Sequence, residues 1–283
     1  MSDTETLIEI LDPLGSCLYH YTRLETVIEH ILPSGRMIMN PFSKMRDPRE
    51  SKALNPVGTA APPQSATLER SRRFAAIYGK SQSVKDQVKV LSLTRDGPAD
   101  GDPETAIFTR GFAHPRLWEQ YADKHRGVCL CFDKEALTRA LMTELAKHGK
   151  PEHGAVMYRD GPIAPTAYTF SLAQIDSESD DDIIDHLIQA GMTELFFTKT
   201  KDWETEAEYR FVVPTRGIEP LPAYVRGALR AVILGELASE HYKPSIVTLL
   251  EQPGVRELNV RILRVRWGDG APFLRDPMAL GYS

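Results

Sequence analysis

The alternation of apolar and polar positions near the start of the chain predicts a strand, a helix and a second strand. Residues 17–21 form a short, largely apolar run typical of a buried strand, and residues 36–40 form another. Between them, five apolar side chains recur at the spacing of one helical face: Leu24, Val27, Ile28, Ile31 and Leu32. Thr22 and Glu25 have the spacing of a capping box, and Gly35 predicts the helix end.

The rest of the chain alternates irregularly between predicted strands and helices. Strands are expected at 88–94, 128–132, 154–158, 206–213, 231–234 and 258–267. Helices are expected at 67–80, 115–125, 134–147 and 239–251, and one more opens in the acidic segment 176–185. This irregular order favours one α+β domain over residues 1–283 rather than a doubly wound sheet. Because the later strands are apolar, residues 214–283 are expected to complete the sheet.

Composition and charge narrow the class of protein. The chain has 283 residues, of which 42% are hydrophobic, and this is enough to bury a sizeable core and excludes global disorder. The 39 acidic and 34 basic residues give a net charge of −5, which argues against a dedicated nucleic-acid binder. A nucleic acid stays open as a partner or as the target of a reaction, although the net charge does not indicate one. No apolar run has the length of a membrane span, so no membrane partner is expected.

The N-terminus and the cysteines predict a cytoplasmic protein. Residues 1–11 carry three acidic and no basic side chains, unlike the start of a secretory signal peptide. The chain has only 3 cysteines, too few for a disulfide framework, and this suits a reducing compartment. Cys129 and Cys131 are expected to be buried in a strand, and no further Cys or His pair has zinc-site spacing, so no metal is expected.

Two aromatic segments contain candidate ligand-binding side chains. His20 stands between two tyrosines at the end of the first strand, where a ligand-binding histidine and a hydrogen-bonded core histidine are equally supported. On the helix at 115–125, one face carries four side chains: Trp118, Tyr121, Ala122 and His125. Trp118 is expected in the core, whereas the polar groups of Tyr121 and His125 need partners and can line a pocket.

A third segment, residues 203–211, alternates charged and apolar side chains. As a strand it places four charged groups on one face: Glu204, Glu206, Glu208 and Arg210. A solvated face is the favoured interpretation. The alternative is a pair of neighbouring carboxylates with separate roles, one in acid–base chemistry and one in stabilising charge. On the strand at 88–94, Ser92 and Thr94 share a face and can orient a nearby carboxylate.

Four motifs in order resemble a large bacterial family of unknown function. They are Leu-Tyr-His-Tyr-Thr at 18–22, Asp-Pro-x-Glu at 47–50, Trp-x-x-Tyr-Ala-x-x-His-x-Gly-Val-Cys at 118–129, and a lysine followed by Trp-x-x-Glu-x-Glu-Tyr-Arg at 203–210. The resemblance covers about residues 18–213. Arg46 and Arg49 depart from the asparagine and aromatic residue that the family pattern has there.

The same order of motifs is more distantly similar to ADP-ribosyltransferases. This resemblance implies split, mostly antiparallel sheets with peripheral helices, and NAD as a substrate lying across the cleft. It implies Glu208 as the catalytic glutamate and Glu206 as its acceptor-side partner. The residues it implies for NAD binding are His20, Tyr21, Thr22, Ser92, Thr94, Tyr121 and His125. A macromolecular acceptor and a role in defence or as a toxin follow from the resemblance alone.

Two other functions stay open. One is a non-catalytic ligand-binding or interaction module on the same fold, which the absence of a decisive catalytic motif supports. The other is a hydrolase with His20 or His125 as general base and Asp47 or Glu50 as its partner, although no nucleophile is evident.

Overall fold

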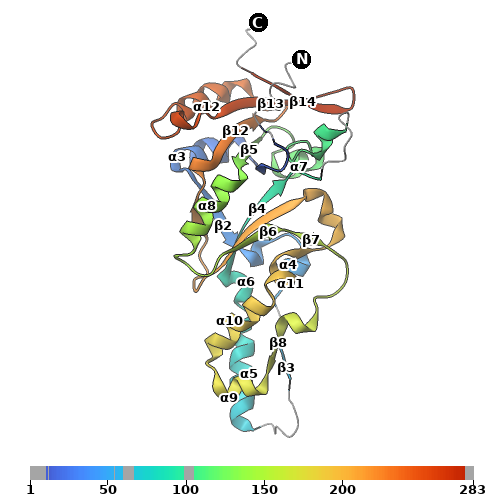
Figure 1. Cartoon of the computed structure of the whole chain (residues 1–283), viewed down its shortest axis with the longest axis vertical. Helices are drawn as coiled ribbons and strands as arrows, with labels where there is room; N and C mark the ends of the chain where they lie inside the picture. The colour runs from blue at the N-terminus through green and yellow to red at the C-terminus, as the bar shows by residue number, and fades with distance from the viewer. Residues whose placement is uncertain (1–10, 12, 54, 60–66, 99–104, 278–283) are drawn as a thin grey trace.

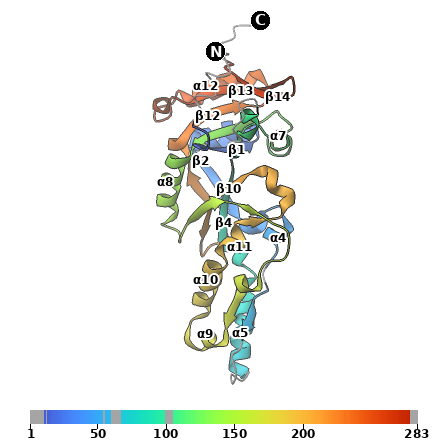
Figure 2. The same cartoon turned by 45° about the vertical axis from the view of Figure 1, so that its right-hand side comes forward.

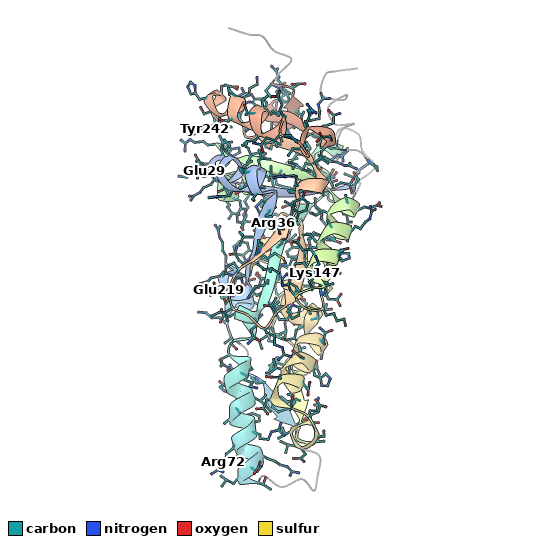
Figure 3. All side chains as sticks on the ribbon, turned by 90° about the vertical axis from the view of Figure 1, so that its left-hand side faces the viewer. Glu29, Arg36, Arg72, Lys147, Glu219 and Tyr242 are labelled. Carbon is teal, nitrogen blue, oxygen red and sulfur yellow. The ribbon has the colours of Figure 1, made fainter. Side chains whose placement is uncertain are left out.

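The molecule is elongated, with a sheet at its wide end and a narrow arm at the other (Figures 1 and 2). The computed structural model describes residues 11, 13–53, 55–59, 67–98 and 105–277. Residues 1–10, which bear on the expected lack of a signal peptide, lie outside the described residues. Arg72 on the arm and Tyr242 beside the sheet mark the two ends (Figure 3). None of the described helices combines the length and hydropathy that a membrane span requires.

The wide end is built on one ten-stranded, mostly antiparallel sheet. Eight strands follow in the order β11 (Leu221–Tyr224), β2 (Arg36–Pro41), β4 (Val88–Arg95), β1 (Cys17–Thr22), β5 (Val128–Asp133), β12 (Leu229–Leu234), β13 (Arg261–Gly268) and β14 (Ala271–Arg275). The other two are β10 (Glu208–Pro214), which pairs with β4, and β6 (Glu152–Ala155), which pairs with β10. Only β12 and β13 run parallel within this sheet. Strands from residues 214–283 therefore lie in the same sheet as strands from the first half.

The sheet opens along β4. One edge of this strand pairs with β10 over its length, from Val88 to Thr94. The other edge pairs with β2 at residues 89–90 and with β1 at residues 94–95. Among the described strands, residues 91–93 pair only with β10. The strands β1 and β2 therefore diverge from β4 and leave its backbone edge uncovered between them.

One face of the sheet is covered by helices whose apolar stripes match the sequence pattern. They are α2 (Leu24–Thr26), η2 (Val27–Ile31), α3 (Leu32–Ser34), α8 (Lys134–Leu145) and α12 (Lys243–Leu250). Gly35 ends the first helical run with a φ of +69°, as predicted. The predicted capping box is wrong, because Thr22 is the last residue of β1 and pairs with Val128. The N-cap is Arg23, whose side chain makes no capping hydrogen bond.

The opposite face carries two separate apolar clusters. The first lies under α7 (Pro115–Tyr121) and contains Trp118 together with Cys129 and Cys131, which are buried as predicted. The second continues from β4 and β10 into the arm, whose helices are α5 (Leu68–Ser81), α9 (Leu172–Ser177), α10 (Asp180–Ala190) and α11 (Met192–Phe196). Strands β3 (Val57–Thr59) and β8 (Thr169–Ser171) pair beside them.

The acidic segment of the chain is paired within the arm. Three ion pairs join α5 to it: Arg70 with Asp176, Arg73 with Asp180 and Lys80 with Asp181. Ser179 caps α10 through a capping box with Asp182, which satisfies free amides at the helix start. The acids thus stabilise the start of α10 and hold it against α5.

The predicted helix at 115–125 and the predicted strand at 206–213 have different ends in the structure, and both differences move candidate site residues. Helix α7 stops at Tyr121, because Asp123, Lys124 and His125 adopt left-handed backbone angles. The backbone N–H of Gly127 closes the turn on the Ala122 carbonyl at 2.8 Å. A Cβ on Gly127 would lie 2.3 Å from the carbonyl oxygen of Thr22, so only glycine fits.

Strand β10 begins at Glu208 rather than at residue 206. The preceding residues form a short 3-10 helix, η6 (Lys201–Glu206), and Ala207 turns the chain with a φ of 44°. Glu206 therefore does not continue the strand face of Glu208. Two smaller strands, β7 (Met157–Tyr158) and β9 (Thr198–Lys199), pair beside η6 and bring Lys199 next to the start of β10.

Candidate functional site

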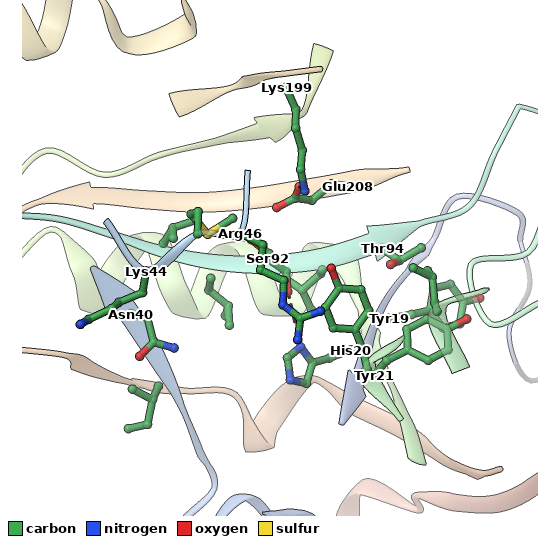
Figure 4. A pocket seen from close by; sticks show the side chains of 17 residues that line it. Tyr19, His20, Tyr21, Asn40, Lys44, Arg46, Ser92, Thr94, Lys199 and Glu208 are labelled. Atoms are coloured by element: carbon green, nitrogen blue, oxygen red, sulfur yellow. Dashed lines mark hydrogen bonds and ion pairs between the residues drawn. The ribbon is translucent and has the colours of Figure 1, made fainter. Parts of the chain in front are cut away.

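A pocket of about 270 Å³ lies where the sheet opens along β4. Its lining comes from β1, β2, β4, α7 and the start of β10, so it draws on segments far apart in the chain. Figure 4 shows His20 and Tyr21 toward one side of the pocket and Asn40 and Lys44 toward the other. The volume falls just below the range of about 300–1,000 Å³ typical of small-molecule sites. A pocket of this volume can hold a small ligand or one end of a larger one.

Tyrosine rings form the apolar walls of the pocket. Tyr21 is fixed by a hydrogen bond from its hydroxyl to the Gly111 carbonyl at 2.7 Å and by edge-on packing against Trp118. Tyr121 projects from the end of α7, and its hydroxyl donates to Glu206 at 2.6 Å. Because both hydroxyls are engaged, the two side chains are held in place. Tyr21 offers ring surface to a ligand, whereas one face of the Tyr121 ring is covered by Arg46.

His20 fills the break in the β4 ladder. Its Nδ1 lies 3.4 Å from the carbonyl oxygen of Ser92, on the stretch of β4 that neither β1 nor β2 covers. Burial lowers the pKa of His20 to about 4. At neutral pH the imidazole is therefore neutral, with one nitrogen donating and the other accepting. Such a group recognises a hydroxyl or an amide rather than an anion.

His20 should make the protein less stable in mild acid. The unfolded chain takes up a proton on this side chain below pH 6.5, whereas the folded protein does so only near pH 4. Stability therefore falls as the pH drops from 6.5 to 4, and the folded pKa corresponds to at most about 3 kcal/mol. We expect urea unfolding to show a steeper decline for the wild type than for His20→Asn. Equal declines would contradict an imidazole that stays neutral in the folded protein.

Behind the pocket lies a chain of buried charges centred on Arg210, whose side chain is 0% exposed. Its Nε donates to Glu208 Oε1 at 2.7 Å, and Nη2 donates to Glu208 Oε2 at 2.9 Å. Its Nη1 donates to the Phe196 carbonyl at 2.7 Å, and Nη2 also pairs with Glu50. Arg210 thus joins the strand to α11 and to α4 (Pro48–Ser51).

Lys199 extends this chain to a third carboxylate. Its Nζ lies 2.6 Å from Glu206 Oε2 and 3.2 Å from Glu208 Oε2, and it stands over the Trp203 ring. The two carboxylates therefore share one cation. Glu206 in turn accepts the hydroxyl of Tyr121, so the chain of contacts reaches the pocket wall.

Glu208 is ionised throughout the physiological range. Burial by itself raises its pKa, but the charges of Arg210 and Lys199 outweigh this and lower the pKa to about 2. The backbone N–H of Glu208 donates to the Tyr158 hydroxyl at 2.7 Å, which fixes the start of the strand. The result is a desolvated carboxylate, 4% exposed, that lines the pocket with a fixed position.

The predicted site residues divide into two groups. Those that line the pocket are His20, Tyr21, Ser92, Thr94, Tyr121 and Glu208. Glu206 lies behind Tyr121, and Thr22 is not part of the lining. His125 does not share a helical face with Tyr121, because α7 ends first, and its ring stacks on Trp118 with centroids 6.4 Å apart.

The favoured interpretation of residues 203–211 as a solvated strand face is wrong. Glu206, Glu208 and Arg210 are buried, and of the four charged groups only Glu204 is exposed. The physical reason is that Glu50 and Lys199, from other segments, supply opposite charges inside the protein.

The carboxylates expected to assist a histidine base make other contacts. Asp47 caps α4 by accepting the Arg49 N–H at 2.9 Å, and it also accepts the Thr200 hydroxyl at 3.1 Å. Glu50 pairs with Arg210. Within the described residues, no group of three or more His, Cys, Asp or Glu side chains could hold a metal ion.

Four residues of the site were not singled out by sequence pattern: Asn40, Lys44, Lys199 and Arg46, the last noted only as a departure from a family motif. No periodicity marks them, because they come from the end of β2, the loop after it and the two-residue strand β9. The basic residue preceding Trp203 in the fourth motif was the available signal for Lys199.

A comparison with protein families identifies part of the chain. No curated protein and no solved structure gives a match. Residues 117–211 match a family model described as Protein of unknown function (DUF2971). This confirms the resemblance to a family of unknown function over α7 to β10, a narrower span than the expected 18–213. The segment that carries Tyr121, Lys199, Glu206 and Glu208 is therefore similar to the family described as Protein of unknown function (DUF2971).

Proposed function

We propose that the pocket binds NAD and that the protein cleaves the bond between nicotinamide and ribose, transferring ADP-ribose to a macromolecular acceptor. The observation that carries the proposal is the carboxylate of Glu208, which is buried, ionised and lines a pocket at the opening of the sheet. The distant similarity to ADP-ribosyltransferases implies the same residue as the catalytic glutamate.

The chemistry needs a fixed negative charge beside the ribose. When the glycosidic C–N bond breaks, its electron pair leaves with nicotinamide, and positive charge develops on the ribose. A carboxylate held in a site of low dielectric stabilises that charge without reorganising. The acceptor nucleophile then forms the new bond to the ribose carbon and releases its proton to water. Glu208 fits the first role, and Glu206 acts by positioning the Tyr121 hydroxyl.

The pocket suits the nicotinamide end of NAD. Its tyrosine walls offer ring surface for stacking, and the neutral imidazole of His20 can hydrogen-bond to an amide or a ribose hydroxyl. Glu208, the first residue of β10, pairs with Thr94 on β4. The Ser92 and Thr94 side chains therefore lie on the same face of the sheet as the Glu208 carboxylate, and all three line the pocket. The volume leaves the adenosine half of NAD outside the pocket mouth.

Incubation of the purified protein with NAD tests the proposal. We expect nicotinamide to be released in proportion to protein concentration, with ADP-ribose or an ADP-ribosylated protein as the other product, measured by liquid chromatography and mass spectrometry. NAD should also raise the melting temperature, since it binds only the folded state. The proposal would be contradicted by the absence of both nicotinamide release and a shift in melting temperature when bacterial lysate is added as a source of acceptor.

A non-catalytic binding module is the second candidate. The observation that favours it is the pairing of Glu208, because both carboxylate oxygens already contact Arg210. Such pairing reduces the charge that the carboxylate offers to a substrate. Binding of NAD without any nicotinamide release, in the presence of the lysate, would favour this module over the enzyme.

A further inference from the structure

The loop that follows β2 carries two cations without acidic partners at the pocket. Lys44 and Arg46 line the pocket and are exposed. Among the residues that the structure describes, no carboxylate lies within ion-pair distance of either. Of the charged side chains that line the pocket, Lys44, Arg46 and Lys199 are cations, whereas Glu208 is a carboxylate that already pairs with Lys199 and Arg210. The charge left over at the pocket mouth is therefore positive.

Arg46 is held in a position that leaves its donors free. Its guanidinium lies over the Tyr121 ring, with 4.8 Å between the central carbon and the ring centroid. Figure 4 shows this side chain pointing into the pocket. Stacking on a ring uses the flat face of a guanidinium and leaves the N–H groups at its edge available. Arg46 thus presents a fork of donors to whatever enters.

The loop is anchored on both sides of these cations. Before them, Phe42 is buried and packs edge-on against Phe196, with centroids 5.1 Å apart. After them, Asp47 is buried and bonded to Thr200 at 3.1 Å. Lys44 and Arg46 therefore project from a short segment with fixed ends, and less conformational entropy is lost when a ligand binds.

We propose that Lys44 and Arg46, with the Asn40 amide on the same side of the pocket as Lys44, form a binding site for the phosphate groups of a nucleotide diphosphate. A guanidinium fork pairs with two phosphate oxygens, an ammonium adds a point charge, and an amide N–H₂ donates to a third oxygen. Figure 4 places Asn40 and Lys44 together on the side of the pocket away from Tyr21. This inference rests on the proposed function and adds to it a binding site for the pyrophosphate of NAD at the mouth of the pocket.

Binding of ADP tests the site apart from catalysis, because ADP has no nicotinamide to release. We expect isothermal titration to show that Arg46→Gln weakens ADP binding by about 10–100-fold, the usual worth of a charge-assisted hydrogen bond. Lys44→Gln should weaken it by a smaller factor, and added salt should reduce the difference from the wild type. Lys52→Gln is the matched control, an exposed lysine of the same segment that does not line the pocket.

Four outcomes decide the inference. Unchanged ADP affinity in both pocket variants would overturn it, and so would an equal loss in Lys52→Gln. Inorganic pyrophosphate binding as tightly as ADP would overturn the assignment to a nucleotide, because the nucleoside would then contribute nothing. ADP binding that depends on Arg46 in a protein that never cleaves NAD would support the phosphate site while the proposed transferase activity fails.

Discussion

Replacing Arg210 by methionine is expected to lower the free energy of unfolding by about 3–5 kcal/mol, the usual cost of removing one partner of a buried ion pair. The guanidinium is fully buried and pairs with both Glu50 and Glu208. Methionine fills a similar volume but leaves both carboxylates inside the protein without this cation. Of these two carboxylates, Glu208 keeps its contact with Lys199. Urea unfolding at pH 7, with the wild type measured in parallel, gives the difference.

The control for this experiment is the variant that also removes the two buried charges. Combining Arg210→Met with Glu50→Gln and Glu208→Gln leaves no unpaired charge at this position, so most of the lost stability should return. An exposed ion pair typically contributes less than about 1 kcal/mol to the free energy of unfolding. A loss this small for Arg210→Met alone would contradict the buried network.

Glu208→Gln is expected to lower the rate of nicotinamide release by about 100- to 1,000-fold, the usual effect of removing one group that stabilises charge in a transition state. Glutamine keeps the shape of the side chain and removes its negative charge. The rate is measured with saturating NAD, so that weaker binding does not enter the comparison. This prediction rests on the proposed activity.

Glu50→Gln is the matched control for Glu208→Gln. Both variants remove one carboxylate partner of Arg210, but only Glu208 lines the pocket. Both should therefore lower the melting temperature, while only Glu208→Gln should abolish most of the nicotinamide release. Equal loss of activity in the two variants would show that Glu208 acts by holding the fold rather than by facing the ribose.

Elements with a strong local pattern were predictable from sequence. The apolar stripe from Leu24 to Leu32 packs on the sheet, and Gly35 ends that helix through a left-handed angle. The core strands were found because both of their faces are apolar, as in β5, and sequence and structure agree there within a residue. The order of the elements predicted a mixed fold of strands and helices, and the resemblance implied mostly antiparallel strands; the large, mostly antiparallel sheet with its helices confirms both.

Short strands with weak patterns were missed. Strands β11 and β14 have 4 and 5 residues, and each contains a proline. Proline breaks the usual strand signal, although an edge strand tolerates it because one side of its backbone needs no partner. Both strands lie at the ends of the main strand order, so their pairing depends on neighbours that are already in place.

The meeting of the site residues depended on tertiary structure alone. His20 contacts the backbone of Ser92, 72 residues later in the chain, only because β1 and β2 diverge along β4. His125 does not line the pocket, and the reason is local: the chain turns after Tyr121, and Gly127 is required where the chain crosses Thr22.

By itself the sequence determined the helices, the core strands and the positions of His20, Tyr121 and Glu208 at the ends of such elements. The burial of Glu206, Glu208 and Arg210 was decided by the tertiary structure. Alternating charged residues look the same whether they face water or opposite charges, because periodicity records only which side chains share a face. What places these three inside the protein is compensation by Glu50 and Lys199, which reach them from other segments once the chain has folded.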